Sequence, residues 1–275
     1  MTSETNSDAL VRVCGLTKQY VQRRAFAREK FTITALENVN LTIRRGATLA
    51  LVGESGAGKS TLGRCLALIE PPTAGEIWWK DVDLLALNRR SLRTMRRKVQ
   101  IIFQDPTSAL NPSMTACEIV AEPLAIQRLG TKAEQYRRAL ELMEQVGLSA
   151  AWARKLPLEF SGGQRQRLAI ARALALEPEL LILDEALSNL DLANQEMILR
   201  FLNDLQGVHG LTYVHVAHDL GMVADLADEI AVMYEGRIVE QKDASRFFLR
   251  AEHSYSQELL AASPTLEAIV AERGV

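Results

Sequence analysis

The chain contains a glycine-rich run whose residue types and spacing suit phosphate binding: Gly53-Glu54-Ser55-Gly56-Ala57-Gly58-Lys59-Ser60. It matches the P-loop pattern, GxxxxGK followed by serine or threonine, and it lies between a predicted strand and a predicted helix. Glycines let backbone N–H groups turn inward around phosphate oxygens, and the helix points its positive end at the same place. We expect Lys59 to reach the β- and γ-phosphates of a nucleotide and Ser60 to coordinate Mg²⁺. The alternative is a glycine turn without a ligand.

An acidic pair supplies the partner that such a phosphate loop needs. Asp184 and Glu185 follow the apolar run Leu180–Leu183, which predicts a buried strand. Open α/β sheets bind ligands at the carboxyl ends of their strands. We therefore expect Asp184 to hold Mg²⁺, directly or through water, and Glu185 to be the general base for the attacking water. An adjacent acidic pair is otherwise often a helix cap.

A third motif lies between these two: Phe160-Ser161-Gly162-Gly163-Gln164-Arg165-Gln166-Arg167. A serine and two glycines at the start of a helix form an anion site from N-terminal N–H groups and the hydroxyl. A capped helix start is the plainer interpretation. The run resembles the signature sequence of ATP-binding cassette (ABC) ATPases, and its place between the phosphate loop and the acidic strand strengthens the resemblance.

Further elements of that family follow in order along the chain. Tyr20 matches the aromatic residue that stacks on adenine, and Gln104 resembles the glutamine of the Q-loop. Ser188–Asp191 resembles the D-loop, and His218 resembles the switch histidine that contacts the γ-phosphate. The resemblance implies a catalytic role for Gln104, Glu185 and His218, and Mg²⁺ ligation by Ser60, Gln104 and Asp184. It implies ATP contacts from Tyr20, from the phosphate loop through Thr61, from Ser161, Gly162, Gly163 and Gln164, and from Asp191.

Within this family, the chain is most similar to the ATPases of oligopeptide, dipeptide and nickel importers. Three segments carry the similarity: Phe103–Pro112, the basic insertion after Tyr20, and the tail His253–Leu260. Two positions depart from the family's pattern, because Ala186 stands where most relatives have proline and Asn189 where alanine is usual. The run DEALSNLDL resembles the nickel-importer members more closely. Some relatives carry a cysteine cluster near the C-terminus, and we expect no iron–sulfur centre here.

The order of predicted elements indicates an α/β fold in which a helical segment interrupts the sheet. Strands are expected at 11–13, 31–43, 47–52, 76–79, 99–103, 180–183, 212–216, 230–233 and 237–240, and helices at 61–69, 88–98 and 131–146. The resemblance implies a P-loop NTPase (RecA-like) core with an antiparallel β subdomain and an inserted α-helical subdomain. We expect one nucleotide-binding domain over 1–275, with its core at 10–104 and 172–245, the helical subdomain at 105–171 and a C-terminal extension at 246–275.

The composition excludes a disordered, a collagenous or a disulfide-stapled protein. The chain has 275 residues, of which 48% are hydrophobic and 24% charged, as is usual for globular domains. Its formal charge of −2 gives no general attraction to nucleic acid or anionic lipid. The basic segments 23–30 and 88–98 therefore read as solvated faces, with lipid or nucleic-acid contact as the alternative. His209, His215 and His218 are not spaced as a metal site, and the sequence has no apolar stretch long enough to span a membrane.

The resemblance also implies partners. In the family the phosphate loop and the signature lie at opposite ends of one chain, so a complete site needs two chains head to tail. We expect a second ABC ATPase subunit, the same or a related one, with two transmembrane permeases and, indirectly, a solute-binding protein. The location expected is the cytoplasmic face of the cell membrane, without nucleic acid. One alternative is an exporter subunit, which the importer-like tail disfavours. The other is a soluble ATPase acting on DNA or ribosomes, which the short spacing between motifs and the single cassette disfavour.

Overall fold

The computed structural model describes residues 8–23, 30–105, 109–187, 192–217, 220–224 and 226–262. These residues form two compact units. The first contains the chain up to Met95 and again from Thr212 onward, and the second runs from Arg96 to Leu211. The boundary falls within helix α2 (Arg89–Lys98). The P-loop belongs to the first unit, and the signature run and the acidic pair belong to the second.

An antiparallel sheet opens the first unit. Its strands run in the order β2-β1-β4-β5 and comprise β1 (Ala9–Arg23), β2 (Lys30–Arg44), β4 (Ala74–Trp79) and β5 (Val82–Asp83). The predicted strands at 31–43 and 76–79 are confirmed, apart from one or two residues at their ends. Trp79 is 3% exposed and packs in the core of this unit.

The strand predicted at 11–13 is wrong in length, because β1 extends over fifteen residues. The register between β1 and β2 shifts at several positions, one of them between Val13 and Leu16, where Gly15 has a φ of 58°. Each shift adds a residue that interrupts the alternation of polar and apolar side chains. A pattern with a strict period of two therefore ends long before the strand does.

The remaining strands of the first unit follow the buried runs of the sequence. They are β3 (Thr48–Val52), β8 (Thr212–Ala217), β9 (Glu229–Tyr234) and β10 (Arg237–Asp243). Strand β3 pairs in parallel with β8 and β9, and β9 pairs antiparallel with β10. Every residue of β3 and β8 is buried, which explains their apolar character. Glu235 and Gly236 have φ of 44° and 79°, as a tight hairpin turn requires.

Helix α1 (Lys59–Leu66) follows β3 after the glycine-rich run. The sequence predicted a helix at 61–69, so the helix begins two residues earlier and ends three residues earlier. Its end has a local cause, because Leu68 adopts a left-handed φ of 58° before the two prolines at 71–72. The earlier start places Lys59, Ser60 and Thr61 in the first helical turn.

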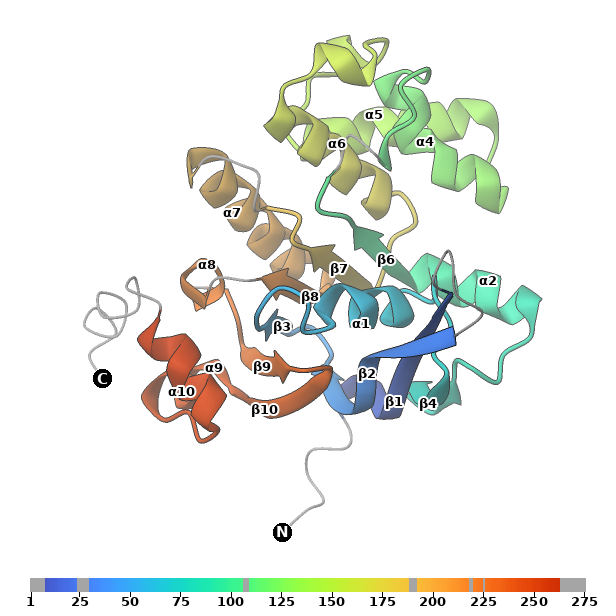
Figure 1. Cartoon of the computed structure of the whole chain (residues 1–275). Helices are drawn as coiled ribbons and strands as arrows, with labels where there is room; N and C mark the ends of the chain where they lie inside the picture. Colours follow the sequence, from blue (N-terminus) through green and yellow to red (C-terminus); the bar gives the residue numbers. More distant parts are fainter. Residues whose placement is uncertain are drawn as a thin grey trace. The chain divides into compact units, whose positions relative to one another are not determined.

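Three short helices complete the first unit: α8 (Leu220–Ala224), α9 (Ala244–Leu249) and α10 (Ser254–Ala261). They pack on the β3–β9 region of the sheet through one cluster of buried side chains. Phe247 of α9 and Tyr255 of α10 join Val52 of β3 and Val232 of β9 in this cluster. Figure 1 shows α9 next to β9 and β10, and the cluster joins the C-terminal helices to β3, the strand that leads into the phosphate loop.

The second unit contains two parallel strands and a group of helices. The predicted strands at 99–103 and 180–183 are confirmed as β6 (Val99–Ile102) and β7 (Leu180–Asp184). Helices α4 (Ala116–Gln127), α5 (Lys132–Gln145) and α6 (Gly162–Leu174) pack against one another. Two 3₁₀ turns, η1 (Ala150–Trp152) and η2 (Pro157–Glu159), precede α6, and α7 (Leu192–His209) follows β7.

Local signals in the sequence set the ends of these helices. Thr115 and Thr131 begin α4 and α5 with reciprocal capping boxes, to Glu118 and Glu134. Gly147, with a φ of 72°, follows α5, which confirms the helix predicted at 131–146. The predicted helix at 88–98 is also confirmed, and α2 has no buried residue. None of the helices in the described part of the chain is long and apolar enough to cross a bilayer.

One buried histidine gives the fold a pH dependence. His215 in β8 is 2% exposed, and neither of its ring nitrogens has a hydrogen-bond partner within the described residues. Burial lowers the pKa of His215 to about 4. The unfolded chain, with a histidine pKa near 6.5, takes up the proton first as the pH falls. His215 therefore reduces the free energy of unfolding between about pH 6.5 and pH 4 and has no such effect above that window.

We expect this residue to remove about 2 kcal/mol of unfolding free energy between pH 7 and pH 5. The measurement is urea unfolding of the wild type and of His215→Leu at both pH values. Leucine changes the absolute stability, but the loss between the two pH values is expected to shrink by that amount. An equal loss in both proteins would show that another group carries this pH dependence.

Candidate functional site: a phosphate loop, a capped anion site and an acidic strand end

The glycine-rich run forms a tight loop between β3 and α1. Gly53 has a φ of 149°, and a Cβ at this position would lie 2.1 Å from the carbonyl oxygen of Met233. Gly58 has a φ of 104°, and a Cβ there would lie 2.4 Å from the carbonyl oxygen of Ala35. Because a side chain would collide with backbone at both positions, only glycine allows the loop to lie this close to its neighbours.

Lys59 holds its ammonium group against the inside of the loop. The residue is 4% exposed, and its Nζ donates hydrogen bonds to the carbonyl oxygens of Gly53 at 2.7 Å and Glu54 at 2.8 Å. Helix α1 has no acidic residue in its first turn. The partial positive charge of the helix and the lysine charge therefore act together on an anion at this end.

Tyr20 lies near the end of β1 and is tied to the first turn of α1. Burial raises the pKa of its phenol, and so does its hydrogen bond to the Glu70 carboxylate, whereas the Thr61 hydroxyl lowers it. The Nζ of Lys18 lies 5.1 Å from the centre of the Tyr20 ring and 3.2 Å from Glu70. The structure thus brings the predicted adenine-stacking ring beside the predicted phosphate helix.

The acidic pair occupies the C-terminal end of β7. Asp184 is the last residue of the strand and is 7% exposed. Glu185 is half-buried and has a φ of 48°, a left-handed conformation that costs a non-glycine residue about 1 kcal/mol. Such strain is found preferentially at functional sites. Ile102 of β6 pairs with Leu183 of β7 in parallel, so the segment leading to Gln104 leaves the sheet at the same edge as the carboxylates.

Ser161 caps helix α6 with the reciprocal pattern of a capping box. The Gln164 N–H donates to the Ser161 Oγ at 3.4 Å, and the Ser161 N–H donates to the Gln164 side chain at 3.0 Å. Ser161 and Gly162 are exposed, and a Cβ on Gly162 would meet nothing within 4 Å. Because the serine oxygen acts as the acceptor in this cap, its own proton remains able to donate to an anion.

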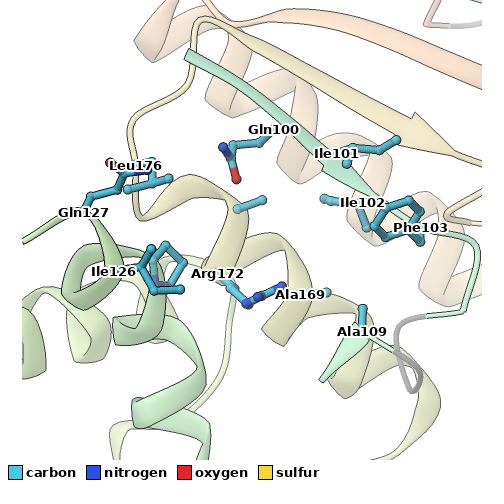
Figure 2. Close-up of a pocket in the computed structure, with 12 residues that line it drawn as sticks. Gln100, Ile101, Ile102, Phe103, Ala109, Ile126, Gln127, Ala169, Arg172 and Leu176 are labelled. Atoms are coloured by element: carbon cyan, nitrogen blue, oxygen red, sulfur yellow. The ribbon is translucent and has the colours of Figure 1, made fainter. Parts of the chain in front are cut away.

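A cavity of about 180 Å³ lies in the second unit, beside β6. Figure 2 shows Ile102 and Phe103 on the β6 side, and Ile126 of α4 and Arg172 of α6 on the other. The guanidinium of Arg172 is paired with Glu122 at 2.8 Å. The lining is therefore mainly apolar with its cation already paired, so we do not assign the cavity to nucleotide.

Several predicted residues cannot be compared with the structure. The residues outside the described part of the chain are Asp191, the rest of the D-loop segment Ser188–Leu190, and His218.

Ala186, which replaces the usual proline, is 2% exposed and packs in the core with Leu187. Among the residues that the structure describes, no group of three or more potential metal ligands occurs.

Tyr255 contacts the phosphate loop, although no motif in the sequence marked it as a site residue. Its phenolic oxygen accepts a hydrogen bond from the backbone N–H of Glu54 in the phosphate loop, at 2.9 Å. The tail around it was recognised only as a mark of family resemblance. Its function could not be read from the sequence, because the two residues lie 201 positions apart.

Comparison with known proteins identifies the family. Residues 36–188 match the model of the family described as ABC transporter. The chain is 43% identical to the dipeptide transport ATP-binding protein DppF of Escherichia coli (strain K12), over 95% of this chain and 78% of that protein. It is also 43% identical to the probable peptide ABC transporter ATP-binding protein y4tS of Sinorhizobium fredii, over 94% of this chain and 73% of that protein.

Solved structures agree with this assignment and with the predicted fold class. The chain resembles the dimeric post-hydrolysis state of the ATP-binding cassette MJ0796 bound to ADP and Pi, with a TM-score of 0.74 and 33% identity, over 88% of this chain and all of that one. It also resembles cbiO1 from Clostridium perfringens, described as part of the ABC transporter complex cbiONQ, with a TM-score of 0.75 and 27% identity, over 96% of this chain and 99% of that one. The chain therefore belongs to the ABC transporter family, as one of its ATP-binding and ATP-hydrolysing subunits.

Proposed function

We propose that this chain powers an importer that carries small peptides across the cell membrane. The observation that carries the proposal is the similarity to named peptide and dipeptide transport subunits along more than nine-tenths of the chain, including the tail His253–Leu260. These names favour peptides over nickel, although the run from Asp184 to Leu192 resembles nickel-importer members. The cargo itself binds to other subunits.

ATP lies against the first unit of this chain. The ring of Tyr20 stacks on the adenine, a contact worth about 1–3 kcal/mol by analogy with base stacking. The N–H groups of the phosphate loop and the first turn of α1, with the Lys59 ammonium, bind the β- and γ-phosphates. The ammonium exchanges loop carbonyl oxygens for phosphate oxygens, which form stronger, charge-assisted bonds.

The donor set of the site suits Mg²⁺. The Ser60 hydroxyl, the Asp184 carboxylate and the Gln104 side-chain carbonyl are oxygen ligands, which this hard cation prefers. The shared strand edge of Asp184 and Gln104 supports their joint role. When bound with ATP, the ion neutralises part of the charge on the transferred phosphoryl group.

Hydrolysis depends on the end of β7. Glu185, which follows Asp184 with a left-handed φ of 48°, accepts a proton from the water that attacks the γ-phosphate. His218 and Gln104 contact the γ-phosphate side of the site. Loss of that phosphate removes the interactions that hold both anion sites together, which provides an order–disorder switch.

The complete site forms between two chains placed head to tail. Ser161, Gly162 and Gly163 of one chain, with Gln164 and the D-loop residue Asp191, close over ATP bound to the phosphate loop of the other. The partner is a second ABC ATPase, and we propose a related subunit rather than another copy. The dimeric state of the cassette MJ0796 supports the pairing of two chains.

The pair drives two permease subunits from the cytoplasmic face of the membrane, and a solute-binding protein delivers the cargo to the permeases. In this assignment residues 10–104 and 172–245 form the catalytic core and 105–171 the helical subdomain that carries the signature. The C-terminal extension covers 246–275. Movement passes through Gln104 and the helical subdomain to the permeases.

The experiment is peptide uptake by proteoliposomes that contain the permeases with different ATPase subunits. With this chain and its related partner, we expect ATP-dependent uptake of labelled di- and tripeptides at least tenfold above vesicles that lack this chain. Equal uptake without this chain would contradict the proposal, as would uptake of nickel but not peptide. Full transport with this chain as the only ATPase would contradict the proposed pairing with a related subunit.

A further inference from the structure

The C-terminal helix α10 makes a direct contact with the phosphate loop. The phenolic oxygen of Tyr255, in the first turn of α10, accepts the hydrogen bond from the backbone N–H of Glu54 at 2.9 Å. Glu54 is the second residue of the loop, and this residue is exposed. The contact therefore fixes the backbone of the loop and not its side chains.

The same residue of the loop also holds Lys59, the lysine of the phosphate loop. The carbonyl oxygen of Glu54 accepts a hydrogen bond from Lys59 Nζ at 2.8 Å. Glu54 is thus fixed on its N–H side by Tyr255 and binds the ammonium group through its carbonyl. A displacement of Glu54 would move the oxygen that positions Lys59 before phosphate binds.

Tyr255 is held rigidly enough for this role. It is 6% exposed, and its ring packs on the ring of Tyr234 with the centroids 4.3 Å apart and the planes at 39°. Phe247, which is fully buried, belongs to the same hydrophobic cluster. Burial raises the pKa of the Tyr255 phenol, so the group stays neutral at physiological pH.

A carboxylate on β10 anchors the start of this helix. Glu240 accepts hydrogen bonds from the N–H of Glu252 at 2.9 Å and of His253 at 3.0 Å, and Lys242 lies 3.0 Å from it. Burial by itself raises the pKa of Glu240. The hydrogen bonds from these N–H groups act in the opposite direction and contribute to a net lowering of the pKa to about 2. His253 then accepts from the Tyr255 N–H at 3.2 Å and caps α10.

We infer that Tyr255 is a positioning residue for ATP binding, because it holds the Glu54 backbone and, through it, the phosphate loop in the conformation that receives the β- and γ-phosphates. The C-terminal segment is therefore part of the nucleotide site without touching nucleotide. This inference concerns ATP binding, which family membership establishes, so it does not depend on peptides being the cargo.

The test is Tyr255→Phe, which removes only the hydroxyl and keeps the ring stack and the core packing. The matched control is Tyr234→Phe, which removes the hydroxyl of the other ring in the same stack. A neutral hydrogen bond of this kind leads us to expect a three- to tenfold rise in the KM for ATP and in its dissociation constant in Tyr255→Phe. The kcat and the melting temperature of the nucleotide-free protein should stay close to those of the wild type.

A second readout separates the phosphate loop from the adenine contact. Inorganic triphosphate should displace a fluorescent nucleotide less well from Tyr255→Phe by the same factor, while adenosine should displace it equally well from both proteins. Wild-type ATP affinity in Tyr255→Phe would overturn the inference. Three other results would also overturn it. They are an equal loss of ATP affinity in Tyr234→Phe, a lower melting temperature of Tyr255→Phe that accounts for its loss of affinity, and weaker binding of adenosine by Tyr255→Phe.

Discussion

Replacing Glu185 by glutamine is expected to leave ATP binding intact and to slow hydrolysis by about 10²- to 10⁴-fold, because the variant lacks the general base that we propose for the attacking water. Glutamine keeps the size of the side chain and tolerates the backbone φ of 48° as well as glutamate does. The effect should therefore appear in kcat and not in the dissociation constant for ATP. The measurements are steady-state phosphate release from the assembled transporter and equilibrium binding of ATP.

The matched control is Glu179→Gln, which makes the same change just before the opposite end of β7. Glu179 forms a partly exposed ion pair with Lys98 at 2.8 Å, and such pairs contribute little to stability. This variant should hydrolyse ATP at the wild-type rate. Normal turnover in Glu185→Gln would remove Glu185 as the base and leave its strained backbone without a catalytic explanation.

The second large effect is expected from Gly162→Asp in the signature run. The position is exposed, and a Cβ meets nothing within 4 Å, so the isolated chain has room for the first atom of a side chain here. An acidic residue at the start of α6 is also compatible with the helix dipole, and the chain should fold normally. A carboxylate about 4 Å from a phosphate charge costs about 4 kcal/mol at an effective dielectric constant of 20, so ATP turnover should fall by at least about 100-fold.

Gly162→Asn is the control that separates charge from shape, because asparagine is nearly isosteric with aspartate and carries no charge. It should retain most of the activity in the assembled transporter. Equal losses in the two variants would mean that the open space beside Gly162, and not its charge environment, is what the site requires.

The sequence predicted most of what is local in this fold. The helix at 131–146 and the capped helix start at Ser161 depend on a few neighbouring residues, and the structure has them where they were expected. The length of β1 could not be predicted, because bulges near Gly15 break the alternation on which strand prediction depends.

The candidate site also contains some features that the sequence predicted and others that it did not. The phosphate loop and the acidic pair are contiguous motifs, and their residue types were sufficient to find them. The contact between Tyr255 and Glu54 joins segments 201 residues apart, so it depends on how the tail packs and no local pattern encodes it. The backbone strain at Glu185 was likewise invisible, since nothing in the residue types around it requires a positive φ.

The central claim is that each ATP lies between the phosphate loop of one chain and the signature run of its neighbour. The direct measurement uses the assembled transporter, in which a tagged copy of this chain carries Gly162→Asp and the partner ATPase is unchanged. A photoreactive ATP analogue then reports which chain holds trapped nucleotide. The account predicts that labelling of the partner is lost while the tagged chain keeps its label, and that Lys59→Ala in the tagged chain gives the reverse. If Gly162→Asp instead removed the label from its own chain and spared the partner, each subunit would enclose ATP by itself and the shared site would be contradicted.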